Sequence, residues 1–106
     1  MLAREEMAWA GGLFEGEGSV FLQRKPSGGY PTVAVEMCDE DPVRRFHQAV
    51  GIGEVTGPYR SKQHPEWKPK WRWRVHGFER TQAVVAMLWP YLGERRRGKA
   101  QEVLHG

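Results

Sequence analysis

The sequence has one cysteine, and none of its apolar runs approaches the roughly 20 residues of a membrane-spanning helix. Because Cys38 has no second cysteine to pair with, an intrachain disulfide is excluded, and we expect a reducing, intracellular setting, either cytoplasmic or organellar. A zinc site is not expected, since the four histidines show no ligand spacing. No signal-peptide pattern is present, and we expect no membrane partner.

Acidic residues are scarce in one part of the chain. The formal net charge of the 106 residues is only +3, but residues 60–74 carry six lysines and arginines against one acid, Glu66. A local basic block of this kind is typical of a surface that meets a polyanion such as nucleic acid. The length predicts one domain over residues 1–106 with a single modest core.

The most informative segment is WAGGLFEGEGS, from Trp9 to Ser19, which contains four glycines and two glutamates. The apolar spacing predicts a helix over about residues 4–15 that stops at Gly16. Each glycine inside a helix costs about 1 kcal/mol relative to alanine, so two of them indicate that another backbone approaches closely. Small residues and one acid fall on one predicted stripe, namely Ala8, Gly11, Gly12 and Glu15.

Glu17 follows at the predicted C-terminal end of this helix, between glycines that leave its carboxylate uncovered. Two interpretations remain open for this acid at this stage. It is either a functional group presented at the helix end, or one of two solvated charges in a plain helix-to-strand turn.

The remaining chain alternates strands and helices. Period-two alternation and turn residues predict a hairpin of strands over 19–25 and 30–38. Asp41 is the expected N-cap of a second helix that ends at Gly51, with Pro42 at its first position. Further strands are predicted over 54–62 and 68–75, followed by helices over 78–88 and 94–104.

The strand over 68–75 has two chemically different faces. Trp71, Trp73 and Val75 alternate with the cations Lys70, Arg72 and Arg74. We expect the aromatic face to pack in the core, although aromatic side chains on a sheet can also stack on bases. The basic face is expected to contact DNA, and an ordinary solvated strand face is the alternative.

The segment from Trp9 to Ser19 resembles the motif of LAGLIDADG homing endonucleases, in the form LAGxxDGEGSF. Ala10 and Gly11 stand where the family usually has Leu and Ala, Glu15 stands for the first Asp, and Glu17 for the second acid. The segments at residues 51–53 and 90–104 also resemble the family. The resemblance implies an α+β fold of αββαββα order, with a four-stranded sheet, helices on one face and a concave DNA-binding face.

The resemblance also implies an activity. Members are site-specific endonucleases of intron or intein mobility that make a metal-dependent double-strand break in a long, near-palindromic DNA target. A single motif per chain implies a homodimer. By resemblance, Glu17 and the Gly16 carbonyl would bind Mg²⁺, and Arg95 or Arg96, near Lys99, would stand for the family's active-site lysine. No glutamine stands near residues 36–38, where the family often has one.

Two sets of residues complete the predicted site. The helix stripe named above is the predicted dimer interface. The candidates for DNA contacts are polar residues at alternate strand positions, namely Gln23, Lys25, Thr32, Glu36, Thr56, Lys70, Arg72 and Arg74. The alternatives are a catalytically silent DNA-binding protein or RNA-splicing maturase on the same scaffold, and a monomeric β-rich nucleic-acid binder, which the mass in solution would distinguish.

Overall fold

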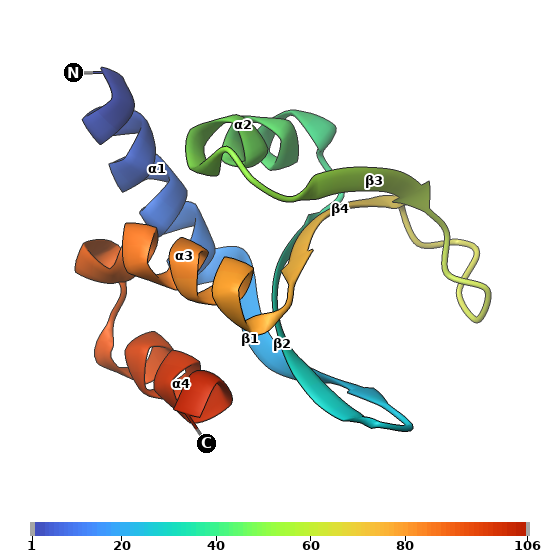
Figure 1. Ribbon diagram of the computed structural model, residues 1–106. Helices are drawn as coiled ribbons and strands as arrows, with labels where there is room; N and C mark the ends of the chain where they lie inside the picture. Colours follow the sequence, from blue (N-terminus) through green and yellow to red (C-terminus); the bar gives the residue numbers. More distant parts are fainter. Residues whose placement is uncertain (1, 106) are drawn as a thin grey trace.

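A computed structural model describes residues 2–105 and has the predicted αββαββα order (Figure 1). The elements are α1 (Leu2–Glu17), β1 (Gly18–Lys25), β2 (Gly28–Met37), α2 (Glu40–Val50), β3 (Glu54–Tyr59), β4 (Lys70–His76), α3 (Phe78–Leu88), the 3₁₀ turn η1 (Trp89–Tyr91) and α4 (Glu94–His105).

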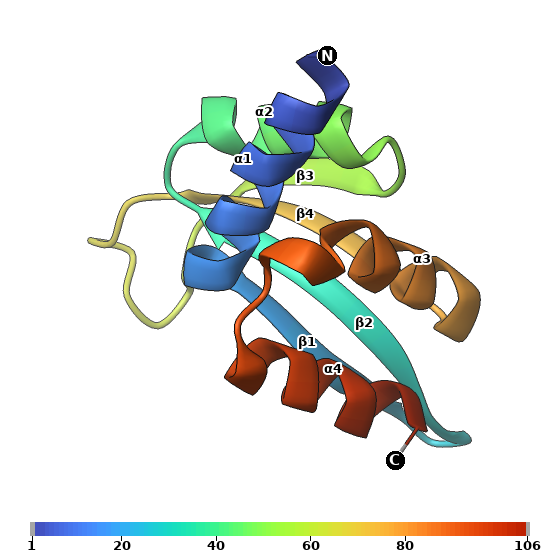
Figure 2. The ribbon, with the colours of Figure 1, turned by 90° about the vertical axis from the view of Figure 1, so that its left-hand side faces the viewer.

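One antiparallel sheet of strand order β1-β2-β4-β3 organises the molecule. The helices cover one face of this sheet, and the other face is concave and open between the β1–β2 turn and the β3–β4 loop (Figures 1 and 2). The α+β fold with helices on one face and a concave opposite face is therefore confirmed.

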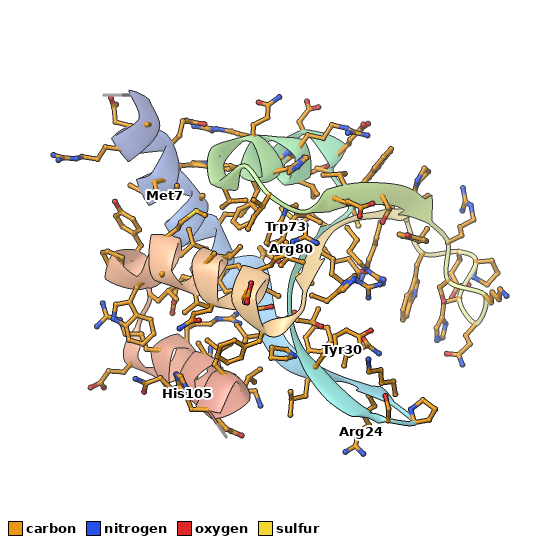
Figure 3. The ribbon with its side chains drawn as sticks, in the orientation of Figure 1. Met7, Arg24, Tyr30, Trp73, Arg80 and His105 are labelled. Atoms are coloured by element: carbon orange, nitrogen blue, oxygen red, sulfur yellow. The ribbon has the colours of Figure 1, made fainter. Side chains whose placement is uncertain are left out.

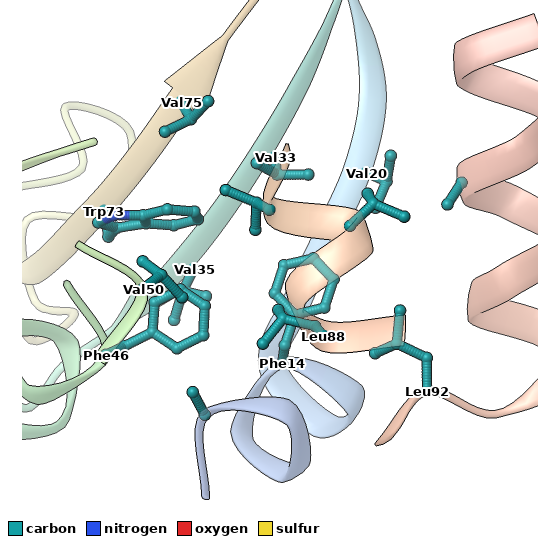
Figure 4. Packing of buried hydrophobic residues seen from close by; sticks show 14 of the residues in the cluster. Phe14, Val20, Val33, Val35, Phe46, Val50, Trp73, Val75, Leu88 and Leu92 are labelled. Carbon is teal, nitrogen blue, oxygen red and sulfur yellow. The ribbon is translucent and has the colours of Figure 1, made fainter. Parts of the chain in front are cut away.

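The core lies between the sheet and the helices (Figure 4). Trp73 of β4 is fully buried, meets the ring of Phe46 at a centroid distance of 4.7 Å, and donates from Nε1 to the carbonyl of Ile52 at 2.9 Å. Phe46 in turn packs on Phe14 of α1, at 6.1 Å between ring centroids. The prediction that the aromatic face of β4 packs in the core is confirmed, because Val75 on the same face is 1% exposed.

Several predicted boundaries differ from the structure. Helix α1 continues to Glu17 instead of stopping at Gly16, and β3 ends at Tyr59 instead of residue 62. Asp39 rather than Asp41 occupies the N-cap position of α2, without a side-chain capping hydrogen bond, and Pro42 is the third residue of the helix. A proline is accepted there because the first four N–H groups of a helix have no partner within the helix. Strand β4 begins at Lys70 instead of Lys68, since Pro69 lacks the N–H that a ladder needs.

An exposed ion pair joins α1 to α2. The guanidinium of Arg45 donates to both carboxylate oxygens of Glu6, at 2.6 and 3.0 Å, and lies 3.9 Å above the ring centroid of Trp9. The hydrogen bond from Arg45 lowers the pKa of Glu6 below its ordinary value.

No helix within residues 2–105 combines the length and the apolar character that a membrane crossing needs.

Candidate functional site

Glu17 is the last residue of α1, and its side chain is exposed. The chain passes from Glu17 directly into β1 because Gly18 carries no side chain. A Cβ at Gly18 would lie 2.2 Å from Cδ1 of Phe14, which is itself 1% exposed. The packing of the core thus fixes the place where the carboxylate of Glu17 leaves the helix.

The start of α4 holds this end of α1 from the other side. The carboxylate of Glu15 accepts the backbone N–H of Gly93 at 3.0 Å, and Arg96 Nε donates to the backbone carbonyl of Glu15 at 3.2 Å. That carbonyl is one of the last four of the helix, and these accept no hydrogen bond from an N–H group within the helix. Both hydrogen bonds fix α1 against α4 two residues before Glu17.

A hollow of about 320 Å³ lies beside the start of β1 and is lined by Ser19, Val20, Arg95, Arg96 and Lys99. The two cations predicted to act near Glu17 therefore line the same hollow, but they differ in their contacts. Arg96 binds α1, as described, whereas no hydrogen bond or ion pair occupies Arg95 within the part of the chain that the structure describes. Lys99 lies 3.8 Å from Glu102. The geometry makes Arg96 a positioning residue and leaves Arg95 available to a ligand.

Residues of the concave face form a second hollow of about 330 Å³ in the middle of the sheet, lined by Ser19, Phe21, Gln23, Ala34, Glu36, Arg72 and Arg74. The register explains this grouping, because Arg74 pairs with Ala34 and Arg72 pairs with Glu36 across β2 and β4. Arg72 donates to Glu36 at 2.8 and 3.0 Å, and Lys70 lies 3.9 Å from the same carboxylate. Among the described residues Arg74 has no such partner.

The other predicted DNA contacts lie in different settings. Lys25 is at the end of the hairpin, 4.9 Å from the ring centroid of Tyr30. The hydroxyl of Thr56 accepts a hydrogen bond from Tyr59 at 2.7 Å. The prediction for Thr32 is wrong, because this side chain is 1% exposed. It stands on the concave face, but its cross-strand neighbours Phe21 and His76 are large and cover it.

The predicted small-residue stripe of α1 divides into two parts. Gly11 is buried against the chain's own Tyr91, and Glu15 contacts Gly93, so these two positions do not lie on an open face. Ala8 and Gly12 are exposed, and a Cβ at Gly12 would meet no described atom within 4 Å. Gly16 is open in the same way, which leaves an exposed stripe of small residues at i, i+4 and i+8.

A third hollow, of about 260 Å³, was not predicted from the sequence. It adjoins the concave face where β3 and β4 enter their connecting loop, and it is lined by Glu36, Tyr59, Arg60, Ser61, Trp67, Lys68, Lys70 and Arg72. Tyr59 and Trp67 are 44% and 52% exposed. Trp67 lies inside the basic block of residues 60–74, and an aromatic residue among cations was the sequence signal that could have indicated this hollow.

The acidic side chains do not form a complete metal site within one chain. No group of three His, Cys, Asp or Glu residues that could hold a metal ion occurs among residues 2–105. The carboxylate of Glu17 and the free carbonyls at the end of α1 are oxygen ligands of the kind that Mg²⁺ prefers, and Mg²⁺ commonly binds through one or two carboxylates. The donor set fits a magnesium ion if further ligands come from outside this chain.

Comparison with known proteins gave structural likenesses only. Neither a protein-family model nor a curated protein matches the sequence. The homing endonuclease I-CvuI, in complex with DNA that is not cleaved in the presence of magnesium, superposes with a TM-score of 0.76 at 20% identity, over 97% of this chain and 66% of that chain.

Two further structures are similar. The archaeal intron-encoded homing endonuclease I-Vdi141I, complexed with DNA, gives a TM-score of 0.70 at 15% identity, over 93% of this chain and 66% of that chain. The LAGLIDADG meganuclease I-AabMI, bound to uncleaved DNA, gives 0.67 at 13% identity, over 91% of this chain and 33% of that chain. The chain thus spans 66% of the length of I-CvuI and I-Vdi141I.

Proposed function

From the LAGLIDADG homing endonuclease fold of this chain, we propose that the protein is a site-specific DNA endonuclease that acts as a homodimer and depends on Mg²⁺. The observation that carries this proposal is the position of Glu17. An exposed carboxylate ends α1 where β1 begins, and the cation-lined hollow of Arg95, Arg96 and Lys99 opens beside that same strand start.

The exposed stripe of α1 supports the homodimer. Ala8, Gly12 and Gly16 would let the α1 helix of a second copy approach closely, because small residues permit close backbone contact. In such a two-fold assembly the C-terminal ends of both α1 helices come together, and each chain contributes its own Glu17. A symmetric protein matches a near-palindromic target, since each copy meets an equivalent half-site.

Four groups of this chain have roles in the proposed reaction. Glu17 and the carbonyl of Gly16 would hold Mg²⁺. The bound ion would supply charge neutralisation at the scissile phosphate and an activated water. The exposed guanidinium of Arg95 would bind a phosphate oxygen of the DNA, because arginine matches phosphate geometry with two parallel hydrogen bonds. Arg96 would keep α1 in place through the carbonyl of Glu15.

The concave face would bind the DNA duplex. Gln23, Arg72 and Arg74 line its central hollow, and glutamine and arginine side chains are suited to adenine and guanine edges in the major groove. Arg74 is the strongest candidate of the three, since Arg72 is engaged by Glu36. Lys25 at the hairpin end would contact phosphates outside this central part.

Cleavage of a randomised DNA library by the wild-type protein and the Glu17→Gln variant tests the proposal. We expect metal-dependent double-strand cuts at a near-palindromic sequence, stopped by EDTA. The variant should cut at least about a hundredfold more slowly, the loss typical of removing a group that stabilises transition-state charge.

Glu79→Gln is the matched control, because Glu79 is an exposed acid in the first turn of α3, outside the exposed stripe of α1. It should cut like the wild type. Specific duplex binding by the wild type and by Glu17→Gln, without cleavage by either, would leave a DNA-binding protein and contradict the catalytic role of Glu17. A monomeric mass in sedimentation would contradict the homodimer.

A further inference from the structure

The third hollow has the composition of a site for one nucleotide. Two exposed aromatic side chains, Tyr59 and Trp67, stand among four cations and one acid. Tyr59 ends β3, and its ring lies 5.1 Å from the guanidinium carbon of Arg72. The hollow shares Glu36 and Arg72 with the central hollow of the concave face, so the two adjoin each other.

The indole of Trp67 is supported from one side. The ring of His64 stacks on it with centroids 4.0 Å apart and planes 11° apart, and Glu66 lies 3.3 Å from His64 Nδ1. Because Trp67 also lines the hollow and is 52% exposed, a flat ring can still be added to its uncovered surface.

Hydrogen bonds inside the β3–β4 loop keep this stack in place. The backbone N–H of His64 donates to Ser61 Oγ at 3.0 Å, and the backbone N–H of Trp67 donates to the carbonyl of His64 at 3.0 Å. Arg60 donates to the carbonyl of Pro65 at 3.3 Å. The loop therefore presents Trp67 in a fixed orientation, which lowers the entropy lost when a ligand binds.

The cations in the hollow fit a phosphate next to that ring. Lys68 and Lys70 precede and begin β4, both are exposed, and Lys70 is only loosely paired with Glu36 at 3.9 Å. Aromatic rings combined with lysines and arginines along a groove are the usual means by which proteins bind single-stranded nucleic acid.

We infer that this hollow binds an unstacked nucleotide, with its base on the uncovered surface of Trp67 and its phosphate on Lys68 and Lys70. A base within a paired duplex shows only its edges in the grooves. The flat face of a base can therefore contact Trp67 only when the nucleotide lies outside the duplex stack. The inference rests on one part of the proposed function, namely that the protein binds a nucleic acid. It adds a second kind of contact, made to a frayed, extruded or single-stranded part of the bound molecule.

Binding of fluorescently labelled oligothymidylate and oligouridylate, each of about ten nucleotides, tests the inference by anisotropy. Trp67→Ala should weaken binding about 5- to 150-fold, the range of a lost base–aromatic stack. Trp67→Phe should retain most of the affinity, because an aromatic surface remains. His64→Ala should give an intermediate loss, since it removes the ring that supports Trp67.

Phe78→Ala is the matched control. Phe78 is 44% exposed, but it begins α3 and does not line the hollow. It should bind both oligonucleotides like the wild type. Trp67-dependent binding of either oligonucleotide supports the inference, and the tighter of the two identifies DNA or RNA as the source of the nucleotide.

The outcomes separate this inference from the endonuclease proposal. Equal single-strand binding by wild type and Trp67→Ala, or none by either, overturns the inference, even where duplex cleavage is intact. Trp67-dependent single-strand binding by a protein that cuts no duplex supports the inference and counts against the endonuclease.

Discussion

Two adjacent glycines of α1 have opposite surroundings. Gly11 is closed by the chain's own Tyr91, since a Cβ there would lie 2.4 Å from the Tyr91 Cβ. Gly12, one residue later, faces open space. The first glycine thus serves the packing of η1 on α1, and the second leaves a surface on which another molecule can pack. Two neighbouring glycines of one motif therefore have different roles, one in packing within the chain and one on an open surface.

The largest stability difference is expected at the closed position. In Gly11→Ala the new methyl group collides with the Cβ of Tyr91, which is attached to the backbone and cannot swing away. Overpacking costs about 1–3 kcal/mol and the gain in helix propensity is about 1 kcal/mol. Because a contact of 2.4 Å to an atom attached to the backbone places the cost at the upper end of this range, we expect a net loss of about 2 kcal/mol in the free energy of unfolding, measured by urea denaturation. An unchanged value would show that η1 moves freely on α1.

At the open position, Gly12, substitution by alanine should raise the free energy of unfolding instead of lowering it. Gly12→Ala meets no described atom within 4 Å, so helix propensity alone should raise the free energy of unfolding by about 0.5–1 kcal/mol. The measurement needs protein concentrations at which the chain is monomeric, because self-association adds to apparent stability. Sedimentation of the same variant should show weaker association, and a stable, unaltered dimer would place the interface elsewhere.

The smallest effect is expected where α1 contacts α2. The hydrogen bond from Arg45 lowers the pKa of Glu6 in the folded state, so this pair stabilises the protein above the ordinary pKa of about 4.5. The contribution is lost as the pH falls through the lowered folded pKa. Urea denaturation of wild type and Arg45→Met at about pH 6 and about pH 3 should show a difference that narrows at the lower pH. A constant difference would mean that Arg45 acts through its contact with Trp9 alone.

Local patterns in the sequence were enough to predict the order of the helices and strands, whereas the single sheet with helices on one face was implied by the family resemblance. The alternation of Trp73 and Val75 with Arg72 and Arg74 placed the two faces of β4 correctly, because a strand has only two faces. The glycine at position 51 was correctly predicted to end α2, and it has a φ of +80°.

Contacts between residues far apart in the sequence could not be predicted from such local patterns. The helical spacing put Gly11 and Gly12 on one stripe, and only the position of Tyr91, 80 residues further on, separates them. Thr32 was placed on the correct face but is covered by neighbours from two other strands. The third hollow depends on how the β3–β4 loop folds back on itself, which no periodicity describes.

The concave face has a consequence for how such a protein can diverge. Along β1 the buried Val20 is followed by Phe21 and, two residues later, Gln23, both of which line the central hollow. Residues that pack in the core and residues that line the concave face are therefore interleaved in the sequence but lie on opposite faces of the sheet. Side chains extend from both faces of the sheet (Figure 3). Substitutions at Gln23 or Arg74 leave Val20 and Trp73 in place. In the proposed DNA-binding role, residues that read the target can therefore be exchanged one at a time while the core that presents them stays the same.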